Sequence, residues 1–317
     1  MQDIPLRRGV IAVTRRHGDA ARPSRIQRQE WRAGYLFLTP NLVGFLVFTF
    51  LPVIAALLLS FSDWSLITSP KWVGIRNYVT LFTDDPTFRK VLRNTVCYTL
   101  GTVPVQAALA LAVAVALNQK LPGEVGFRTA FFLPTISSTV AIALVWRWIF
   151  NADFGVLNMI LYMLGVTDPP KWLTSTTWAL PALMIVSIWQ GIGFNMVIFL
   201  AGLQGIPQQL YEAARIDGAG SWTQFRFITL PLLSPTMFFV LVMTTIGSFQ
   251  VFDLAAIMTE GGPANATNTI VYYIYRCGFQ FFKMGYAAAI AWVLFLIIFV
   301  VTLLQFRFQR SWVTYDL

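Results

Sequence analysis

Residue types that support catalysis are sparse in this chain of 317 residues. Its one histidine, His17, lies in a basic N-terminal segment. Its two cysteines, Cys97 and Cys277, are isolated and lack the spacing of a metal site. No His is placed with a Ser, Cys or acidic residue in a pattern typical of nucleophilic catalysis. The sequence therefore predicts neither a catalytic centre nor a metal centre.

The most informative polar segment runs from Glu212 to Pro231, between two long apolar runs. Within it, Gly218 and Gly220 allow a sharp turn after a first short helix. A second helix is expected to begin at Ser221, because Ser221 and Gln224 have the spacing of a capping box. The segment is therefore predicted to form a helix-turn-helix elbow at a membrane surface, suited to docking a partner.

This elbow resembles the EAA loop of permease subunits of binding-protein-dependent ABC importers. The matching residues are Glu212, Ala213, Ala214, Asp217, Gly218, Ala219, Ile228, Leu230 and Pro231. The resemblance implies that the helix around Glu212 lies in a cleft of a cytoplasmic ATP-binding subunit, with a narrow face at Ala213 and Ala214. The residues it assigns to ATPase coupling are Glu212, Ala213, Ala214, Asp217, Gly218 and Gly220. The alternative is an ordinary amphipathic interfacial loop.

A second stretch, from Gly261 through Tyr275 to Ala287, resembles the carbohydrate branch of this family, on the side of the MalF and UgpA type of first permease. The resemblance begins near Trp31 and continues to the C-terminus. It implies the membrane domain of a type I ABC importer, a second homologous permease, two cytoplasmic ATP-binding subunits and an extracytoplasmic substrate-binding protein. ATP is then expected on the partner ATPase subunits, and no cofactor is expected in this chain.

The composition independently predicts an all-α, polytopic membrane protein. The chain is 56% apolar and only 12% charged, which is too little polar surface for a soluble globule of this size. A hydrocarbon core about 30 Å thick needs roughly 20 helical residues. Six charge-free runs are long enough, the third being the shortest: 33–62, 94–119, 129–146, 172–211, 227–252 and 284–306. The sequence therefore predicts six transmembrane helices.

The net charge of +9 is concentrated ahead of the first run and is not attributed to nucleic-acid binding. The arginines there are Arg7, Arg8, Arg15, Arg16, Arg22, Arg25, Arg28 and Arg32. By the positive-inside rule the N-terminus is cytoplasmic, and an even number of spans returns the C-terminus to the same side. We expect a basic, lipid-facing cytoplasmic tail at 1–33 and a transmembrane domain at 34–317, with its core at 94–306. The resemblance places the chain in a bacterial-type cytoplasmic (inner) membrane.

The energy source for transport is expected to lie outside this chain. A phosphate-binding loop needs Gly-Lys-Ser or Gly-Lys-Thr, and none of the five lysines follows a glycine. Ion-coupled carriers usually hold ionisable groups deep in their spans. Arg147 and Asp253, the only such groups near a span, are placed toward the outer face. The chain is therefore predicted not to be an enzyme; the open alternatives are an ion-coupled secondary carrier, a glycerophosphate-type importer, and a scaffold or enzyme without transport.

The fourth run carries candidate substrate contacts near the middle of the membrane. Amides are costly in lipid, so Gln190 and Asn195 must face a cavity or a partner helix. Sugars are bound by amides together with aromatic faces. The tentative path residues are Trp189, Gln190, Phe194, Asn195 and Gln250. The alternative is that the amides join helices and that neighbouring glycines only permit close packing.

The segment from Glu260 to Tyr286 is expected outside the membrane, between the last two spans. Gly261, Gly262 and Pro263 signal a turn, and the tyrosines that follow lie on an amphipathic stretch. Two interpretations are open. The stretch is either an interfacial aromatic belt or a plug that contacts the binding protein or the mouth of the cavity.

Overall fold

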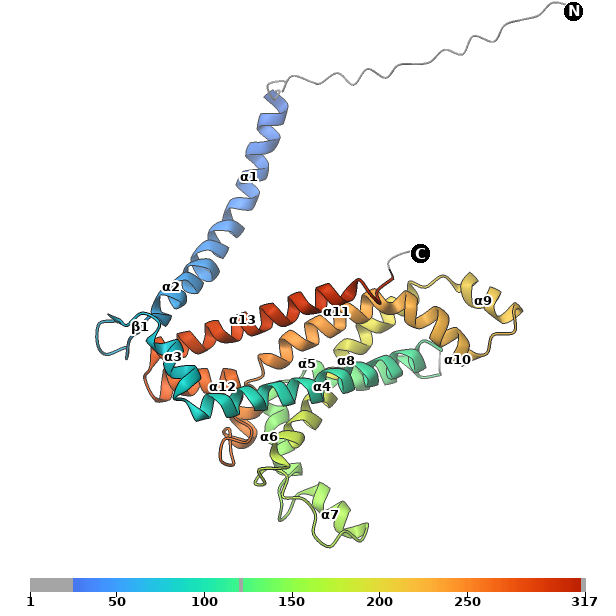
Figure 1. Cartoon of the computed structure of the whole chain (residues 1–317). Coiled ribbons are helices and arrows are strands. Elements are labelled where there is room, and N and C mark those ends of the chain that lie inside the picture. The colour runs from blue at the N-terminus through green and yellow to red at the C-terminus, as the bar shows by residue number, and fades with distance from the viewer. Residues whose placement is uncertain (1–24, 120–121, 315–317) are drawn as a thin grey trace, which may run out of the picture. The chain divides into compact units, whose positions relative to one another are not determined.

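The computed structural model describes residues 25–119 and 122–314, and these form helices with a single short strand pair (Figure 1). The prediction of an all-α protein is therefore confirmed. The chain divides into two compact units, residues 1–55 and 56–317. Most of the predicted basic tail, up to residue 24, lies outside the described residues.

The described part of the first unit is helical throughout. It comprises α1 (Arg25–Phe45), the π-helical turn η1 (Leu46–Phe50) and the first half of α2 (Leu51–Ser60). The helix begins at Arg25, well before the apolar run that starts at Ala33, so the end of the predicted tail is helical. No residue of α1 or η1 is buried. An apolar helix without a covered face needs lipid or another subunit around it.

Within the described residues, five unbroken helices are long and apolar enough to cross a membrane. They are Arg25–Ser60, Pro86–Leu117 (α4), Ala179–Gln204 (α8), Ser221–Phe249 and Met284–Gln309 (α13). The helix Ser221–Phe249 consists of α10 (Ser221–Gln224), the π-helical turn η2 (Phe225–Thr229) and α11 (Leu230–Phe249). The third predicted span is instead a bent pair, α5 (Glu124–Ile136) and α6 (Thr139–Ile149), with an angle of 98° between them. The predicted six spans are obtained when this pair counts as one.

The bend between α5 and α6 has a local cause. Pro134 has no N–H to donate and weakens the last turn of α5, and Ser137 then adopts an extended conformation. The Ser137 hydroxyl donates to the Leu133 carbonyl at 2.8 Å, which occupies a carbonyl near the end of the helix. The Thr135 hydroxyl donates to the Gln190 carbonyl at 2.9 Å and fixes the end of α5 against α8.

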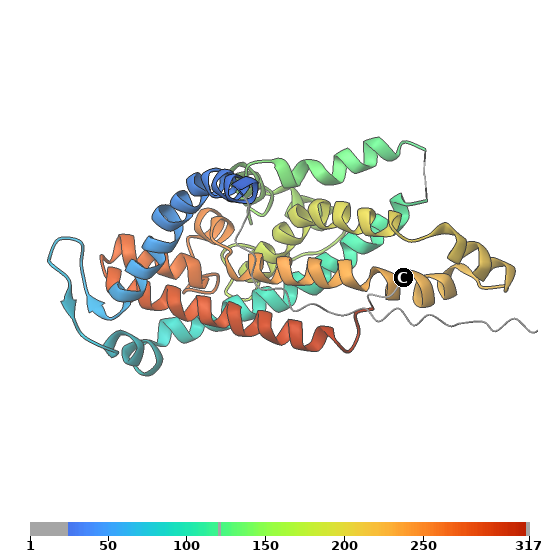
Figure 2. The same cartoon turned by 90° about the horizontal axis from the view of Figure 1, so that it is seen from above.

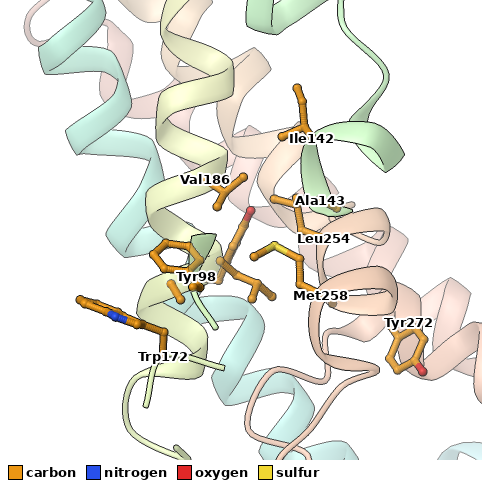
Figure 3. Packing of buried hydrophobic residues seen from close by; sticks show 12 residues of the cluster. Tyr98, Ile142, Ala143, Trp172, Val186, Leu254, Met258 and Tyr272 are labelled. Carbon is orange, nitrogen blue, oxygen red and sulfur yellow. The ribbon is translucent and has the colours of Figure 1, made fainter. Parts of the chain in front are cut away.

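The core of the second unit lies along the contact between α4 and α8. Toward the end near the elbow, small residues of α4 face large residues of α8: Ala107, Ala110, Ala114, Met196, Phe199 and Leu203. Toward the opposite end, Tyr98 and Val186 pack with Leu254 and Met258, as Figure 3 shows. The pairing of alanines with bulky side chains lets the two helices approach closely.

Short elements cover the two ends of this helix bundle. At one end lie β1 (Ser62–Asp63) paired antiparallel with β2 (Lys71–Trp72), α3 (Arg76–Thr83), the π-helical turns η3 (Ala255–Thr259) and η4 (Arg276–Gln280), and α12 (Ile270–Tyr275). The helix α7 (Val156–Met163) follows α6 and projects away from the long helices (Figure 1). At the opposite end lie α9 (Gln208–Ile216) and α10, beyond the ends of α8 and α11 (Figures 1 and 2). The predicted elbow is therefore separated from the α12 region by the length of the spans.

The loop before α12 is packed into the protein. The Asn94 amide of α4 donates to the carbonyl of Asn265 at 2.7 Å and to that of Asn268 at 3.1 Å. Tyr272 and Tyr273 are also buried, in two different core clusters. The aromatic-belt interpretation is therefore wrong for these two tyrosines, because side-chain packing within the protein outweighed their interfacial preference.

Candidate functional site

The elbow begins with α9, which follows Pro207, and turns at Gly218. The Gly218 N–H donates to the Arg215 carbonyl at 3.0 Å, and the Ala219 N–H donates to the Ala214 carbonyl at 2.8 Å. This pair of bonds is a Schellman motif, which needs a left-handed residue just beyond the helix. Gly218 supplies it with a φ of +82°. The predicted turn at Gly218 is confirmed.

Two other local predictions for the elbow are wrong. Gly220 has a φ of −69° and a ψ of 168°, which any residue adopts, so the turn does not require a glycine there. The capping box is also absent from α10, because Ser221 is already its first helical residue and Gly220 is the cap. The Gln224 amide instead donates to the Ala219 carbonyl at 2.8 Å, and this bond links α10 to the turn that precedes it.

The outer surface of the elbow is open and chemically mixed. Glu212, Ala213 and Asp217 are exposed, whereas Ala214 is half-buried. The side chains of Glu212 and Asp217 form no hydrogen bond or ion pair with any described residue. Ile216 on the same helix is 87% exposed. Two carboxylates without partners beside an exposed isoleucine form a surface that fits a docking partner.

A cavity of about 470 Å³ lies among α4, the α5–α6 pair, α8 and the end of α11. Its walls carry amides, hydroxyls and aromatic rings. The side chains that matter below are Tyr98, Gln106, Gln190, Phe194, Asn195, Thr244, Ser248, Gln250 and Asp253. Of the described lining residues, only Asp253 carries a charge at neutral pH. Such a lining can exchange hydrogen bonds with a polyhydroxylated molecule without compensating for a charge on it.

The structure brings four of the five tentative path residues to this cavity: Gln190, Phe194, Asn195 and Gln250. Trp189 is the exception. It is 41% exposed and its ring lies 5.5 Å from that of Trp146, edge to face, away from the cavity. One residue earlier on a helix is a rotation of about 100°, so Trp189 and Gln190 face different sides.

The side-chain amides at the cavity differ in whether they already have a hydrogen-bond partner within the protein. Asn195 donates to the Thr244 hydroxyl at 3.0 Å, and Gln190 donates to the Thr139 hydroxyl at 3.1 Å. These two amides therefore join α8 to its neighbours, as the packing alternative expected. The side chains of Gln106 and Gln250, in contrast, have no hydrogen-bond partner within 25–119 and 122–314. Their amides are free to bind a ligand.

The glycines beside these amides serve close packing. A Cβ at Gly193 would collide with the carbonyl oxygen of Phe131 on α5. A Cβ at Gly191 would collide with the Gln106 side chain. Gly193 is therefore required for α5 to approach α8 at the cavity, whereas a side chain at position 191 would displace the Gln106 amide.

Residue-by-residue reading of the sequence missed the contribution of α4. Gln106 lines the cavity, and Thr99 accepts a hydrogen bond of 3.0 Å from Ser248 on α11. A signal was present, because Thr95, Thr99, Thr102 and Gln106 follow the spacing of one helical face. All four are buried. A polar stripe of this kind within a span marks the face directed at the protein interior.

Residues 87–313 match the family described as "Binding-protein-dependent transport system inner membrane component". The chain belongs to this family. It is accordingly a multi-pass, inner-membrane permease component. The family that the sequence motifs predicted is confirmed.

Individual relatives of this permease family cover nearly the whole chain. The probable ABC transporter permease protein YesP of Bacillus subtilis is 42% identical over 96% of this chain and 99% of its own length. The lactose transport system permease protein LacF of Rhizobium radiobacter is 39% identical over 88% and 94%. A crystal structure of a bacterial alginate ABC transporter, in complex with an alginate pentasaccharide-bound periplasmic protein, has a chain with a TM-score of 0.79 at 25% identity, covering 90% and 96%.

Proposed function

We propose that this chain is one of two membrane subunits of an ATP-driven carbohydrate importer that works by alternating access. The lining of the 470 Å³ cavity carries the proposal, because its free amides, hydroxyls and aromatic rings suit a sugar. The substrate named for LacF, a relative 39% identical, is also a sugar. A second permease is proposed to complete the path, and an extracytoplasmic binding protein to deliver the substrate.

The elbow is proposed to couple transport to ATP hydrolysis on two separate cytoplasmic subunits. Glu212 and Asp217 offer unpaired carboxylates, and Ile216 offers an apolar contact. Closure of the ATP-bound subunits would move α9 and open the cavity outward, and hydrolysis would reset it. This role places the elbow, and with it both chain termini, on the cytoplasmic side.

The charge of the cavity favours a neutral saccharide over an acidic one. Asp253 would repel a uronate or a phosphate ester, and no lysine or arginine lines the described cavity wall to offset it. Arg147 is outside this lining, where its guanidinium donates to the Ile257 carbonyl at 3.3 Å. A glycerophosphate-type substrate is therefore disfavoured for this permease.

The test is uptake by the assembled transporter in proteoliposomes, with its binding protein present. Radiolabelled lactose, maltose and a glucuronate disaccharide serve as probes, with and without ATP inside. We expect ATP-dependent uptake of at least one neutral sugar and none of the acidic one. ATP-independent, ion-driven uptake would contradict the importer, and ATP-driven uptake of only the acidic sugar would contradict the neutral substrate.

The coupling role is tested with Gly218→Pro. Proline has no N–H for the bond to Arg215 and cannot adopt a positive φ. Uptake and substrate-stimulated ATP hydrolysis should both fall to background. Gly220→Ala is the matched control, because the backbone of Gly220 already suits any residue. A Gly218→Pro transporter with normal uptake would remove the elbow from the mechanism.

A further inference from the structure

A single side chain of α9, the first helix of the elbow, hydrogen-bonds to a described residue of the spans. The Tyr211 hydroxyl and the Thr229 hydroxyl are joined by a hydrogen bond of 3.0 Å. The Tyr211 ring also packs against the core cluster formed by α4, α8 and α11. No other side chain of α9 hydrogen-bonds to a described residue. Tyr211 directly precedes Glu212, so the exposed docking surface and the hydrogen bond to Thr229 involve adjacent residues of α9.

Thr229 occupies an unusual place in the backbone. It ends the π-helical turn η2, in which the Leu230 N–H donates to the Phe225 carbonyl. Its hydroxyl donates to the Gln224 carbonyl at 3.4 Å. A hydroxyl has one proton, so this bond leaves the Thr229 oxygen to accept from Tyr211. Thr229 is only 6% exposed, and Tyr211 is half-buried.

A large cavity lies beside the hydrogen bond between Tyr211 and Thr229. A cavity of about 710 Å³ separates α9 from the ends of α4 and α8, and both Tyr211 and Thr229 line it. The two hydroxyls thus form a polar link between α9 and the helix Ser221–Phe249 at the wall of this cavity. Tyr211 therefore links the inner face of α9 to the spans in two ways, through its ring on the core cluster and through its hydroxyl on Thr229.

The helix Ser221–Phe249, which contains Thr229, ends at the candidate substrate cavity. α11 is continuous from Leu230 to Phe249, and Thr244 and Ser248 near its far end line the 470 Å³ cavity. Thr229 and Thr244 are separated by about 22 Å along the axis, at 1.5 Å per residue. The Thr244 hydroxyl also accepts a hydrogen bond from the Asn195 amide of α8. One continuous helix therefore joins the elbow to the cavity wall.

We infer that Tyr211 and Thr229 are positioning residues that transmit elbow movement through α11 to the substrate cavity. The inference rests on the coupling role proposed above for the elbow. It assigns to one hydrogen bond the side-chain link between α9 and the helix Ser221–Phe249, in addition to their backbone connection through 217–220. Removing this bond leaves the surface that faces the ATP-binding subunits unchanged.

The test compares Tyr211→Phe, Thr229→Val and the double variant in the assembled transporter. The readout is the number of sugar molecules imported per ATP hydrolysed, normalised to assembled complex, with the neutral sugar found to be transported. Loss of one hydrogen bond should lower this ratio by roughly two- to tenfold in each single variant. The double variant should lose no more than either single variant, because both remove the same bond.

Three further variants separate the inference from a loss of folding. Thr229→Ser keeps the hydroxyl and should retain the wild-type ratio. Tyr162→Phe on α7 and Thr83→Val on α3 remove the same groups away from the elbow and should leave the ratio unchanged. A wild-type ratio in Tyr211→Phe and Thr229→Val, while Gly218→Pro is inactive, would overturn the inference and leave the proposed function standing. Normal import in Gly218→Pro as well would overturn both.

Discussion

Asp85 and Tyr273 lie far apart in the sequence, yet the Tyr273 hydroxyl donates to the Asp85 carboxylate at 2.6 Å. Tyr286 donates to the same oxygen at 2.6 Å, and the Phe88 N–H donates to the other oxygen at 2.9 Å. The start of α4 is thereby fixed to α12 and to the start of α13. Burial alone would raise the pKa of Asp85, but these hydrogen bonds outweigh it and lower the pKa.

The lowered pKa of Asp85 makes stability depend on acid. A carboxyl with a lower pKa in the folded state stabilises that state while it is ionised. The contribution is fully present above the pKa of the unfolded chain, near 4, and is lost as the pH falls through the lower folded value. We expect the melting temperature of the purified transporter to fall in this acid range. Tryptophan fluorescence during heating, measured from pH 7 to pH 3, provides the check.

Asp85→Asn should reproduce the acid effect at neutral pH, since an amide has only one accepting oxygen. It cannot accept from the two tyrosine hydroxyls at one terminal atom and from the Phe88 N–H at the other. Its melting temperature should be lower than that of the wild type at pH 7 and should depend less on pH. Asp84→Asn is the control, because Asp84 is exposed and its side chain has no hydrogen bond to a described residue. Equal losses of stability in both variants would remove the special role of Asp85.

Asn94 is predicted to stabilise the loop before α12. It is 7% exposed, and its amide bonds two carbonyls of that loop. Asn94→Ala leaves these carbonyls without their donor and should destabilise the protein by about 1 to 3 kcal/mol. Asn118→Ala, at the exposed end of the same helix, should change stability by less than about 0.5 kcal/mol. Denaturant midpoints in detergent distinguish the two variants, and equal midpoints would contradict the prediction.

Much of the fold could be predicted from this sequence because the membrane limits the possible structures. Uncharged runs of the required length can span only as helices, so six runs gave the architecture directly. The turn at Gly218 was also predictable, since the sequence around it ends one helix and begins another. The family motif identified the elbow because its residues are contiguous.

The remaining features depend on contacts between distant segments. The bend after Pro134 could not be inferred from hydropathy, because both halves of the run are equally apolar. Trp189 was assigned to the path from its composition, yet its angular position on α8 turns it toward Trp146. The tyrosines of α12 suited a lipid interface equally well until Asp85, from another part of the chain, supplied a partner for Tyr273.

Gly193 is predicted to be essential for packing. A methyl group there would meet the backbone of Phe131, which cannot rotate away as a side chain can. Gly193→Ala should therefore destabilise the permease by about 1 to 3 kcal/mol through overpacking. Gly126→Ala, at a helical glycine with open space around it, should be neutral or slightly stabilising. The yield of assembled complex and its melting temperature test the pair, and a neutral Gly193→Ala would show that α5 moves freely relative to α8.

The last prediction separates ligand contacts from helix contacts in the cavity. Gln250 lines the cavity, and its side chain has no hydrogen bond to a described residue, whereas Asn195 is 3% exposed and its amide is bonded to Thr244. Gln250→Ala should leave assembly intact and slow transport of the neutral sugar by roughly two- to tenfold per complex, as expected for one lost hydrogen bond. Asn195→Ala should instead lower the melting temperature of the complex and leave the transport rate of the surviving complex nearly unchanged. Uptake kinetics normalised to assembled complex measure both effects. If Gln250→Ala transports at the wild-type rate, the free amide is not a substrate contact, and if Asn195→Ala slows transport without loss of stability, that amide binds substrate directly.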